Sequence, residues 1–202
     1  MNSVHVFIIS WQGKHENSMA IARTLAGSVE RISMVYSDPD PHLSLDAPCE
    51  LIRTPNELFW ANKFKHCVDA CDADILLVIH GDTSCDSWPG LVASARKTFS
   101  SFRNIGAWAP YVDGTQFTPE VTQIGAIAAS SLKVVVVNDG IVFAISRPVV
   151  NRMRSINYEE NIYGWGISYM ISAYCYDNKL MAVLDSGLLV RHPKERGYDS
   201  SK

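Results

Sequence analysis

The sequence lacks any long apolar run. No stretch approaches the ~20 consecutive apolar residues that a membrane-spanning helix needs, and no basic segment precedes an apolar core at the N-terminus, as it would in a secretory signal. Cysteine is also scarce, since the five cysteines in 202 residues are odd in number and irregularly spaced. That usage is typical of reduced thiols rather than of a disulfide framework. We therefore expect a cytoplasmic protein with no transmembrane segment.

An excess of charge of one sign is missing as well. The chain has 18 lysines and arginines against 21 aspartates and glutamates, which gives a net charge of -3 at pH 7. No overall basic field would steer the protein to nucleic acid, so we expect no nucleic-acid partner. The hydrophobic content of 47% is ordinary for a globular chain, and 202 residues are typical of one domain.

Several catalytic signatures are absent. There is no G-x-G-x-x-G after the first apolar run, no G-x-x-x-x-G-K-[ST] and no G-x-S-x-G, which argues against dinucleotide oxidoreductases, P-loop kinases and α/β-hydrolases. His66, Cys67 and Cys71 lie within about one helical turn, but no second cluster completes a zinc site. Cys85 and His80 are a conceivable nucleophile and base, yet no third group orients them.

What the sequence does contain is an alternation of apolar strands and amphipathic helices. This order predicts an α/β fold with a mixed, mostly parallel sheet flanked by helices, in which residues 73–79 form a central strand. We expect strands at 4–10, 31–36, 49–54, 73–79, 105–112, 133–139, 141–147 and 180–193. We expect helices at 16–30, 57–71 (capped by Asn56), 91–102, 148–156 and 163–177, while 113–130 has no clear pattern.

Polar loops follow three of the predicted strands. WQGKHEN comes after the first strand, SDPDPH after the second, and HGDTSCD after the strand at 73–79. In a mostly parallel sheet, the loops at the carboxyl ends of the strands converge, and ligands bind there. We therefore expect these three loops to meet at one edge.

The loop HGDTSCD carries two carboxylates, Asp82 and Asp86, between a strand and a helix. Carboxylate oxygens suit Mg²⁺ or Mn²⁺, and such an ion is commonly completed by phosphate oxygens. With a nucleoside diphosphate as ligand, the ion would neutralise the charge of the leaving group. The alternative is structural, because an aspartate in this position also caps helices and stabilises turns.

Four segments together resemble the GT-A-fold glycosyltransferases of the family 2 type. They are ADILLVIHGDT with SWPGLV (73–92), VNDGIVFAISR (137–147), IYGWGISY (162–169) and VLDSGLLVRHPKERGYD (183–199). The resemblance implies a single GT-A, Rossmann-like domain over residues 1–202, with a donor-nucleotide half at about 1–112 and an acceptor half at about 113–202. It implies transfer of a sugar from a nucleotide-sugar donor to the hydroxyl of a glycan or other acceptor, assisted by Mn²⁺ or Mg²⁺.

The resemblance also implies roles for individual residues. The metal would be held by Asp82, at the last position of an Asp-x-Asp motif, with His192 and His80. The acceptor would approach Trp165 and Ser168. Residues expected to bind the nucleotide are Ser10, Trp11, Asp38, Lys63, Gly81 and Asp82. Simpler interpretations remain for two of these positions, a solvated helix face for Lys63 and a surface histidine for His192.

Two positions depart from the family pattern. His80 replaces the first aspartate of the metal motif, and imidazole is a poorer ligand for Mg²⁺ than for Mn²⁺. Ser168 stands where related sequences carry an acidic general base, and a serine hydroxyl does not accept a proton at neutral pH without activation. Either another acid is the base, with Glu159, Glu160 and Asp185 as candidates, or the chain is a noncatalytic nucleotide-sugar-binding domain that acts within a larger protein or complex.

Overall fold

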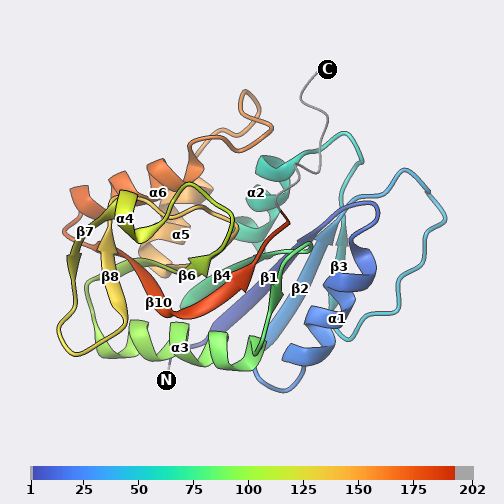
Figure 1. Ribbon diagram of the computed structural model, residues 1–202. Helices are drawn as coiled ribbons and strands as arrows, with labels where there is room; N and C mark the ends of the chain where they lie inside the picture. The colour runs from blue at the N-terminus through green and yellow to red at the C-terminus, as the bar shows by residue number, and fades with distance from the viewer. Residues whose placement is uncertain (1, 194–202) are drawn as a thin grey trace.

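The computed structural model describes residues 2–193, which form a 10-stranded sheet with helices on both faces (Figure 1). The strands are β1 (Val4–Ser10), β2 (Arg31–Tyr36), β3 (Glu50–Arg53), β4 (Ile75–His80), β5 (Ser84–Cys85), β6 (Ile105–Val112), β7 (Gln123–Ala126), β8 (Leu132–Val135), β9 (Val142–Ser146) and β10 (Met181–Arg191). The helices are α1 (His15–Leu25), α2 (Trp60–Ala70), α3 (Trp88–Ser101), α4 (Pro119–Thr122), α5 (Arg147–Arg154) and α6 (Ile167–Asp177).

The sheet is mixed, and most of its strands point the same way. Its order is β3-β2-β1-β4-β9-β6-β10-β8-β7, with β5 paired to β10. β9 runs antiparallel to both neighbours, and β8 and β5 run antiparallel to β10, while the remaining described strands share one direction. The predicted α/β fold with a mixed, mostly parallel sheet is therefore confirmed.

Each face of the sheet has its own core. Strand β1 is buried along its whole length, and its alternate side chains enter opposite layers. Ile8 packs in the layer beneath α1 and α3, whereas Phe7 packs with Phe64 of α2 in the layer that also includes α5 and α6. Figure 1 shows these two helical layers on opposite faces of the strands. Strand β4 lies between β1 and β9 and is likewise buried on both faces, as its continuous apolar run predicts.

Helix boundaries differ from the sequence-based prediction where caps were misjudged. Helix α2 begins at Trp60 with Phe59 as N-cap, so Asn56 does not cap it. Helix α3 begins at Trp88 because the Ser87 side chain accepts a hydrogen bond from the Gly90 amide and proline follows in the first turn. Asp82 therefore does not cap this helix, which removes the helix-capping alternative for that residue.

The second half of the chain contains the largest deviations. The strand predicted at 133–139 ends at Val135, because only residues 132–135 pair with β10 or β7, and residues 136–141 cross to β9 as a loop. The unassigned residues 113–130 include α4 and the edge strand β7, which pairs with β8. Within residues 2–193, no helix is long and apolar enough to cross a membrane. The final residues of the 183–199 segment, from 194 onward, lie outside the described residues.

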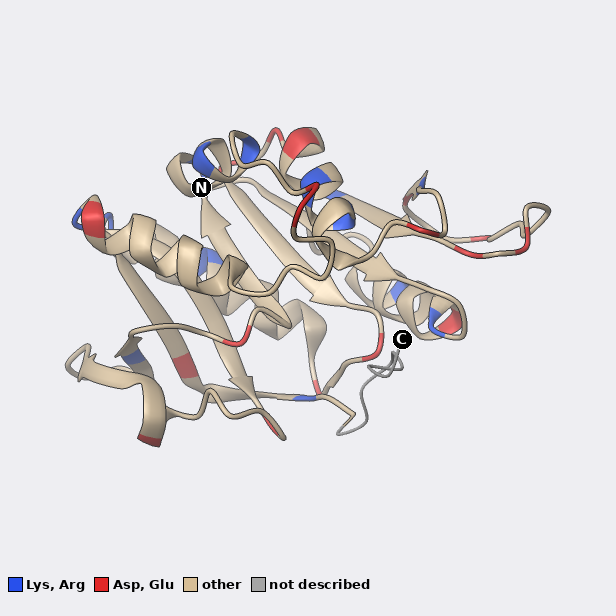
Figure 2. Cartoon of the chain, turned by 90° about the horizontal axis from the view of Figure 1, so that it is seen from above, with Lys and Arg blue, Asp and Glu red and all other residues tan. Residues whose placement is uncertain are grey.

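Charged residues of both signs are intermingled over the described chain. Figure 2 shows lysine and arginine positions distributed over several helices, with acidic positions among them and in the loops. Several of these charges are paired across elements, for example Arg96 of α3 with Glu30 (2.6 Å) and Arg191 of β10 with Asp86 (2.7 Å).

Candidate functional site

The turn after β4 is held tightly against the neighbouring elements. The Gly81 amide donates to the Ile9 carbonyl at 2.8 Å, and a Cβ at Gly81 would come within 2.2 Å of the Ser18 hydroxyl. The side-chain amide of Asn17 donates to the carbonyls of Gly81 (2.8 Å) and Thr83 (3.0 Å). The absence of a side chain at Gly81 thus allows close contact between the turn and the start of α1.

Three side chains that the sequence analysis predicts as metal ligands lie close together here. They come from the end of β4, from this turn and from the residue after β10. The ligand atoms of His80, Asp82 and His192 all lie within 4.8 Å of one another. His192 Nε2 is 3.5 Å from Asp82 Oδ2, and its backbone amide is anchored to Asp113 Oδ1 at 2.9 Å. The structure therefore joins residues that are 110 positions apart in the sequence.

The Asp82 carboxylate is nearly enclosed and only partly satisfied. Its side chain is 7% exposed, and Oδ1 is a buried oxygen with no hydrogen-bond partner. Burial raises the pKa of Asp82, but the contact with His192 and the nearby His80 outweigh it and hold the pKa below its ordinary value. The same contact with Asp82 raises the pKa of His192.

These residues fit a divalent cation. An ionised carboxylate with an unpaired buried oxygen, next to an imidazole, is a donor set suited to Mn²⁺ and less well suited to Mg²⁺. His80 differs from its two neighbours, because the Trp60 indole nitrogen donates a hydrogen bond to its Nε2. Burial lowers the pKa of His80 to about 4, so this ring is neutral at pH 7.

The loops after β1 and β2 form a second, adjoining group. The Ser10 hydroxyl lies 2.8 Å from His15 Nδ1, and His15 Nε2 lies 3.0 Å from Asp38 Oδ2. Asp38 Oδ1 accepts the backbone amide of Asp40 at 2.9 Å. These hydrogen bonds, together with the Asn17 contacts described above, confirm that the three polar loops meet at one edge of the sheet.

Ser10 and Lys63 are both buried, and both form hydrogen bonds within the protein. Ser10 is fully buried, and its hydroxyl also accepts a hydrogen bond from Ser18 at 2.9 Å. Lys63 is 4% exposed and donates to the Ser10 carbonyl at 2.9 Å, and burial lowers its pKa to about 8. Both residues therefore support the loop, and the expectation that Lys63 lies on a solvated helix face is wrong. Trp11 is half-buried, with its ring 6.2 Å from that of His80 and edge-on to it.

The segment that leads into α6 covers the same edge. Trp165 is 68% exposed, and its backbone amide and carbonyl are both bonded to the Asn161 side chain at 3.1 and 2.7 Å. A Cβ at Gly164 would lie 2.3 Å from the indole of Trp60, so this segment rests on the tryptophan that contacts His80. Ser168, at the start of α6, faces Gly140, where a Cβ would be 2.5 Å from its hydroxyl.

The three carboxylates proposed as bases have different surroundings. Asp185 is buried, with its oxygens accepting from the hydroxyls of Ser94 (2.7 Å) and Ser131 (2.5 Å), and the structure does not bring it into the His80 cluster. Glu159 and Glu160 are exposed in the loop between α5 and α6.

A fourth carboxylate, Asp139, lies closer to the cluster and was missed by sequence analysis. The Ile141 carbonyl accepts the His80 amide at 3.2 Å, and Asp139 Oδ1 accepts the Ile141 amide at 2.9 Å. Burial raises the pKa of Asp139 to about 6. The signal that could have found it is its place in VNDG, directly before the apolar strand that pairs with β4.

No protein-family model and no curated protein matches the sequence. Solved structures do match. GalNAc-T7 with UDP, GalNAc and Mn²⁺ has a TM-score of 0.74 and 11% identity over 100% of this chain and 45% of that chain, so the chain spans less than half of that protein. Glucosyl-3-phosphoglycerate synthase from Mycobacterium tuberculosis, with Mn²⁺, UDP and glucosyl-3-phosphoglycerate, has a TM-score of 0.65 and 13% identity, covering 96% of this chain and 73% of that one.

A nucleotidyltransferase matches as well. The inositol-1-phosphate CTP transferase from T. maritima has a TM-score of 0.58 and 15% identity, covering 99% of this chain and 93% of that one. The fold is therefore GT-A-like, the fold of glycosyltransferases and nucleotidyltransferases. At these identities the likeness shows the fold alone, and function must be argued from the site.

Proposed function

We propose that this protein is a metal-assisted glycosyltransferase that moves a sugar from a nucleotide-sugar donor to the hydroxyl of a glycan or other acceptor. The observation that carries the proposal is the pair of Asp82 and His192 at the carboxyl end of the sheet, with an unpaired, buried carboxylate oxygen on Asp82. On a GT-A-like fold this edge is where a nucleotide is expected to bind. A bound Mn²⁺ or Mg²⁺ would supply charge neutralisation for the departing diphosphate.

The loop residues around this pair have distinct tasks in the proposal. Asp82 and His192 hold the ion, and Gly81 lets the turn approach α1 closely. Asp38 binds the base or ribose of the donor, held in place by His15, which is in turn bonded to Ser10. Trp11 borders the nucleotide on the side of His80.

The acceptor is proposed to approach along the segment before α6. An exposed indole offers a flat apolar face that suits a sugar ring, and Trp165 is the most exposed aromatic ring near the cluster. We expect the acceptor also to contact Ser168, which lies beside Gly140, the residue that follows Asp139.

Asp139 is the base that the geometry favours. It adjoins the segment bonded to His80, whereas Glu159 and Glu160 are solvent-exposed and the oxygens of Asp185 are engaged by serines. We expect Asp139→Asn to reduce the transfer rate by about 10²- to 10⁴-fold, and Glu159→Gln and Glu160→Gln to have smaller effects. A larger loss in either glutamate variant, measured as nucleotide release from the donor, would move the base to that glutamate.

Calorimetric titration with UDP, GDP and their sugar derivatives, each with and without Mn²⁺, tests the donor site. We expect Mn²⁺-dependent binding of one nucleotide, lost in Asp82→Asn. Asp86→Asn is the matched control, because Asp86 lies in the same loop but is exposed and paired with Arg191. Tight binding without metal would remove the metal assignment, and no binding under any condition would refute the proposed function.

A second candidate is a noncatalytic nucleotide-sugar-binding domain. It is favoured by Ser168, which stands where related sequences carry an acidic general base and which does not accept a proton at neutral pH without activation. Donor binding without transfer or donor hydrolysis, in wild type and Asp139→Asn alike, would support this candidate over the enzyme.

A further inference from the structure

The indole N–H of Trp60 donates a hydrogen bond to one of the two ring nitrogens of His80, Nε2. An indole N–H only donates hydrogen bonds, so His80 Nε2 accepts this bond through its lone pair. A neutral imidazole carries its single proton on the other nitrogen, which here is Nδ1. The Trp60 contact therefore selects the Nδ1–H form of His80.

This form is unsuited to bind a metal ion. An imidazole coordinates metal through a nitrogen lone pair. In His80 one nitrogen is protonated and the lone pair of the other is engaged by Trp60. His192 is not constrained in this way, since its Nε2 faces the Asp82 carboxylate at 3.5 Å.

Trp60 is held in place from several sides and does not readily turn away from His80. Its ring is stacked on that of Phe64, with centroids 5.2 Å apart and planes at 14°. Gly164 lies against its benzo ring, where even a Cβ would come within 2.3 Å. The first turn of α2 is also tied to the loop before α6, because the Ala61 amide donates to the Ile162 carbonyl at 3.1 Å.

We propose that His80 is a hydrogen-bond donor to the anionic diphosphate of the nucleotide, through Nδ1–H, and that Trp60 is the positioning residue that fixes this form. The inference rests on the proposed function. Asp82 and His192 then hold the ion, and His80, whose ring lies beside both, contacts the phosphate oxygens.

With histidine rather than aspartate at position 80, the interaction of this position with the negatively charged diphosphate changes. A second carboxylate at position 80 would repel the diphosphate unless an ion lay between them. A neutral N–H instead attracts phosphate oxygen directly. The site therefore has a component of nucleotide binding that does not depend on metal.

Nitrogen-15 NMR of the histidine side chains tests the form of His80 without any ligand. The wild-type protein at pH 7.5 is expected to show His80 protonated at Nδ1, with its signals assigned by their loss in His80→Asn. Trp60→Phe removes the indole donor, so the Nε2–H form is expected to appear. Adding Mg²⁺ with UDP is expected to shift the ring nitrogens of His192 and to leave His80 protonated at Nδ1. A wild-type His80 protonated at Nε2 would overturn the inference.

Binding measurements with Mn²⁺ and UDP form the second arm. His192→Asn is expected to weaken Mn²⁺ binding at least tenfold, while His80→Leu and His80→Asn change it less than twofold. Without metal, His80→Leu is expected to weaken UDP binding about tenfold, and His80→Asn, which keeps an N–H donor, much less. Equal loss of Mn²⁺ affinity at positions 80 and 192 would refute the inference while leaving the proposed function intact. Failure of the wild type to bind any nucleotide would refute the proposed function, whereas the NMR result would still decide the form of His80.

Discussion

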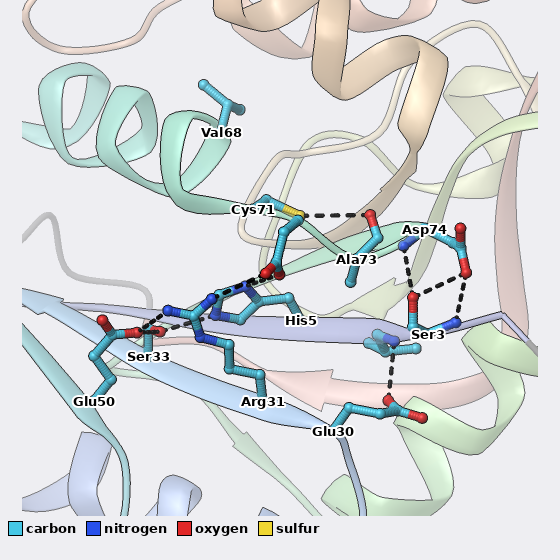
Figure 3. A network of polar contacts seen from close by, with 12 residues as sticks. Ser3, His5, Glu30, Arg31, Ser33, Glu50, Val68, Cys71, Ala73 and Asp74 are labelled. Atoms are coloured by element: carbon cyan, nitrogen blue, oxygen red, sulfur yellow. Dashed lines mark hydrogen bonds and ion pairs between the residues drawn. The ribbon is translucent and has the colours of Figure 1, made fainter.

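Replacing His5 by glutamine is expected to make the protein less sensitive to acid. His5 is fully buried on β1, at the end of the sheet opposite the candidate site, and Figure 3 shows it among the polar groups there. The Ser33 hydroxyl donates to Glu50 at 2.7 Å and therefore accepts from His5 Nε2 at 2.8 Å. His5 Nδ1 is buried without a hydrogen-bond partner, 3.8 Å from the exposed Asp72.

The magnitude follows from the pKa of this ring. Burial, assisted by the positive charge of Arg31, lowers the pKa of His5 from 6.5 to about 4. The unfolded chain therefore binds a proton between these two values that the folded protein does not bind, and stability falls as the pH drops from 6.5 toward 4. The full cost is about 3 kcal/mol, because each pH unit is worth about 1.4 kcal/mol. Between pH 7 and pH 5 the loss due to His5 is about 2 kcal/mol.

Urea unfolding at pH 7, 6 and 5 measures this effect. Glutamine does not titrate and keeps an N–H donor near Ser33, so His5→Gln is expected to lose about 2 kcal/mol less than the wild type between pH 7 and pH 5. The surrounding carboxylates titrate in both proteins, so most of their contribution cancels in the difference. A stability difference between the two proteins that is constant across this range would refute the reasoning, even if the variant were less stable throughout.

Three further substitutions have expected outcomes. Gly81→Ala places a Cβ 2.2 Å from the Ser18 hydroxyl, and we expect it to lower the unfolding free energy by about 1–3 kcal/mol in urea unfolding; unchanged stability would contradict the close packing. Ser87→Ala removes the N-cap of α3 and is expected to cost about 1 kcal/mol, with Ser100→Ala on the exposed face of the same helix as control. His15→Phe removes the partner of Asp38 and is expected to weaken nucleotide binding about tenfold in calorimetry, because a hydrogen bond to a charged group is worth about 1.5–3 kcal/mol. An unchanged dissociation constant would show that Asp38 does not need this support.

The interior strands were predictable from the sequence because burial on both faces produces continuous apolar runs. β1, β2 and β6 have the predicted bounds. The shorter elements β5, β7 and α4 contain two to four residues each, too few to show a hydrophobic period. β5 forms by pairing with β10 and β7 by pairing with β8, while α4 is a single local turn. The early end of the strand at 133–139 likewise depends on its pairing with β10 and β7.

The candidate site was predictable in its position but not in its connections. The rule that loops meet at the carboxyl ends of parallel strands places Asp82 and Asp38 at one edge. The contact of Trp60 with His80 depends on how α2 docks on the sheet, which no local pattern encodes. The burial of Lys63, and its bond to Ser10, come from the same docking.

The insertion of β9 between β4 and β6 has a consequence for synthesis on the ribosome. Both strands precede β9 in the chain, so their facing edges stay unpaired until residues 142–146 have emerged. Nascent chains that end before that point present two long apolar strands with open edges, a form prone to edge-to-edge association. We therefore expect a slow translational pause before β9 to reduce the yield of soluble protein, and a pause after β10 to have little effect.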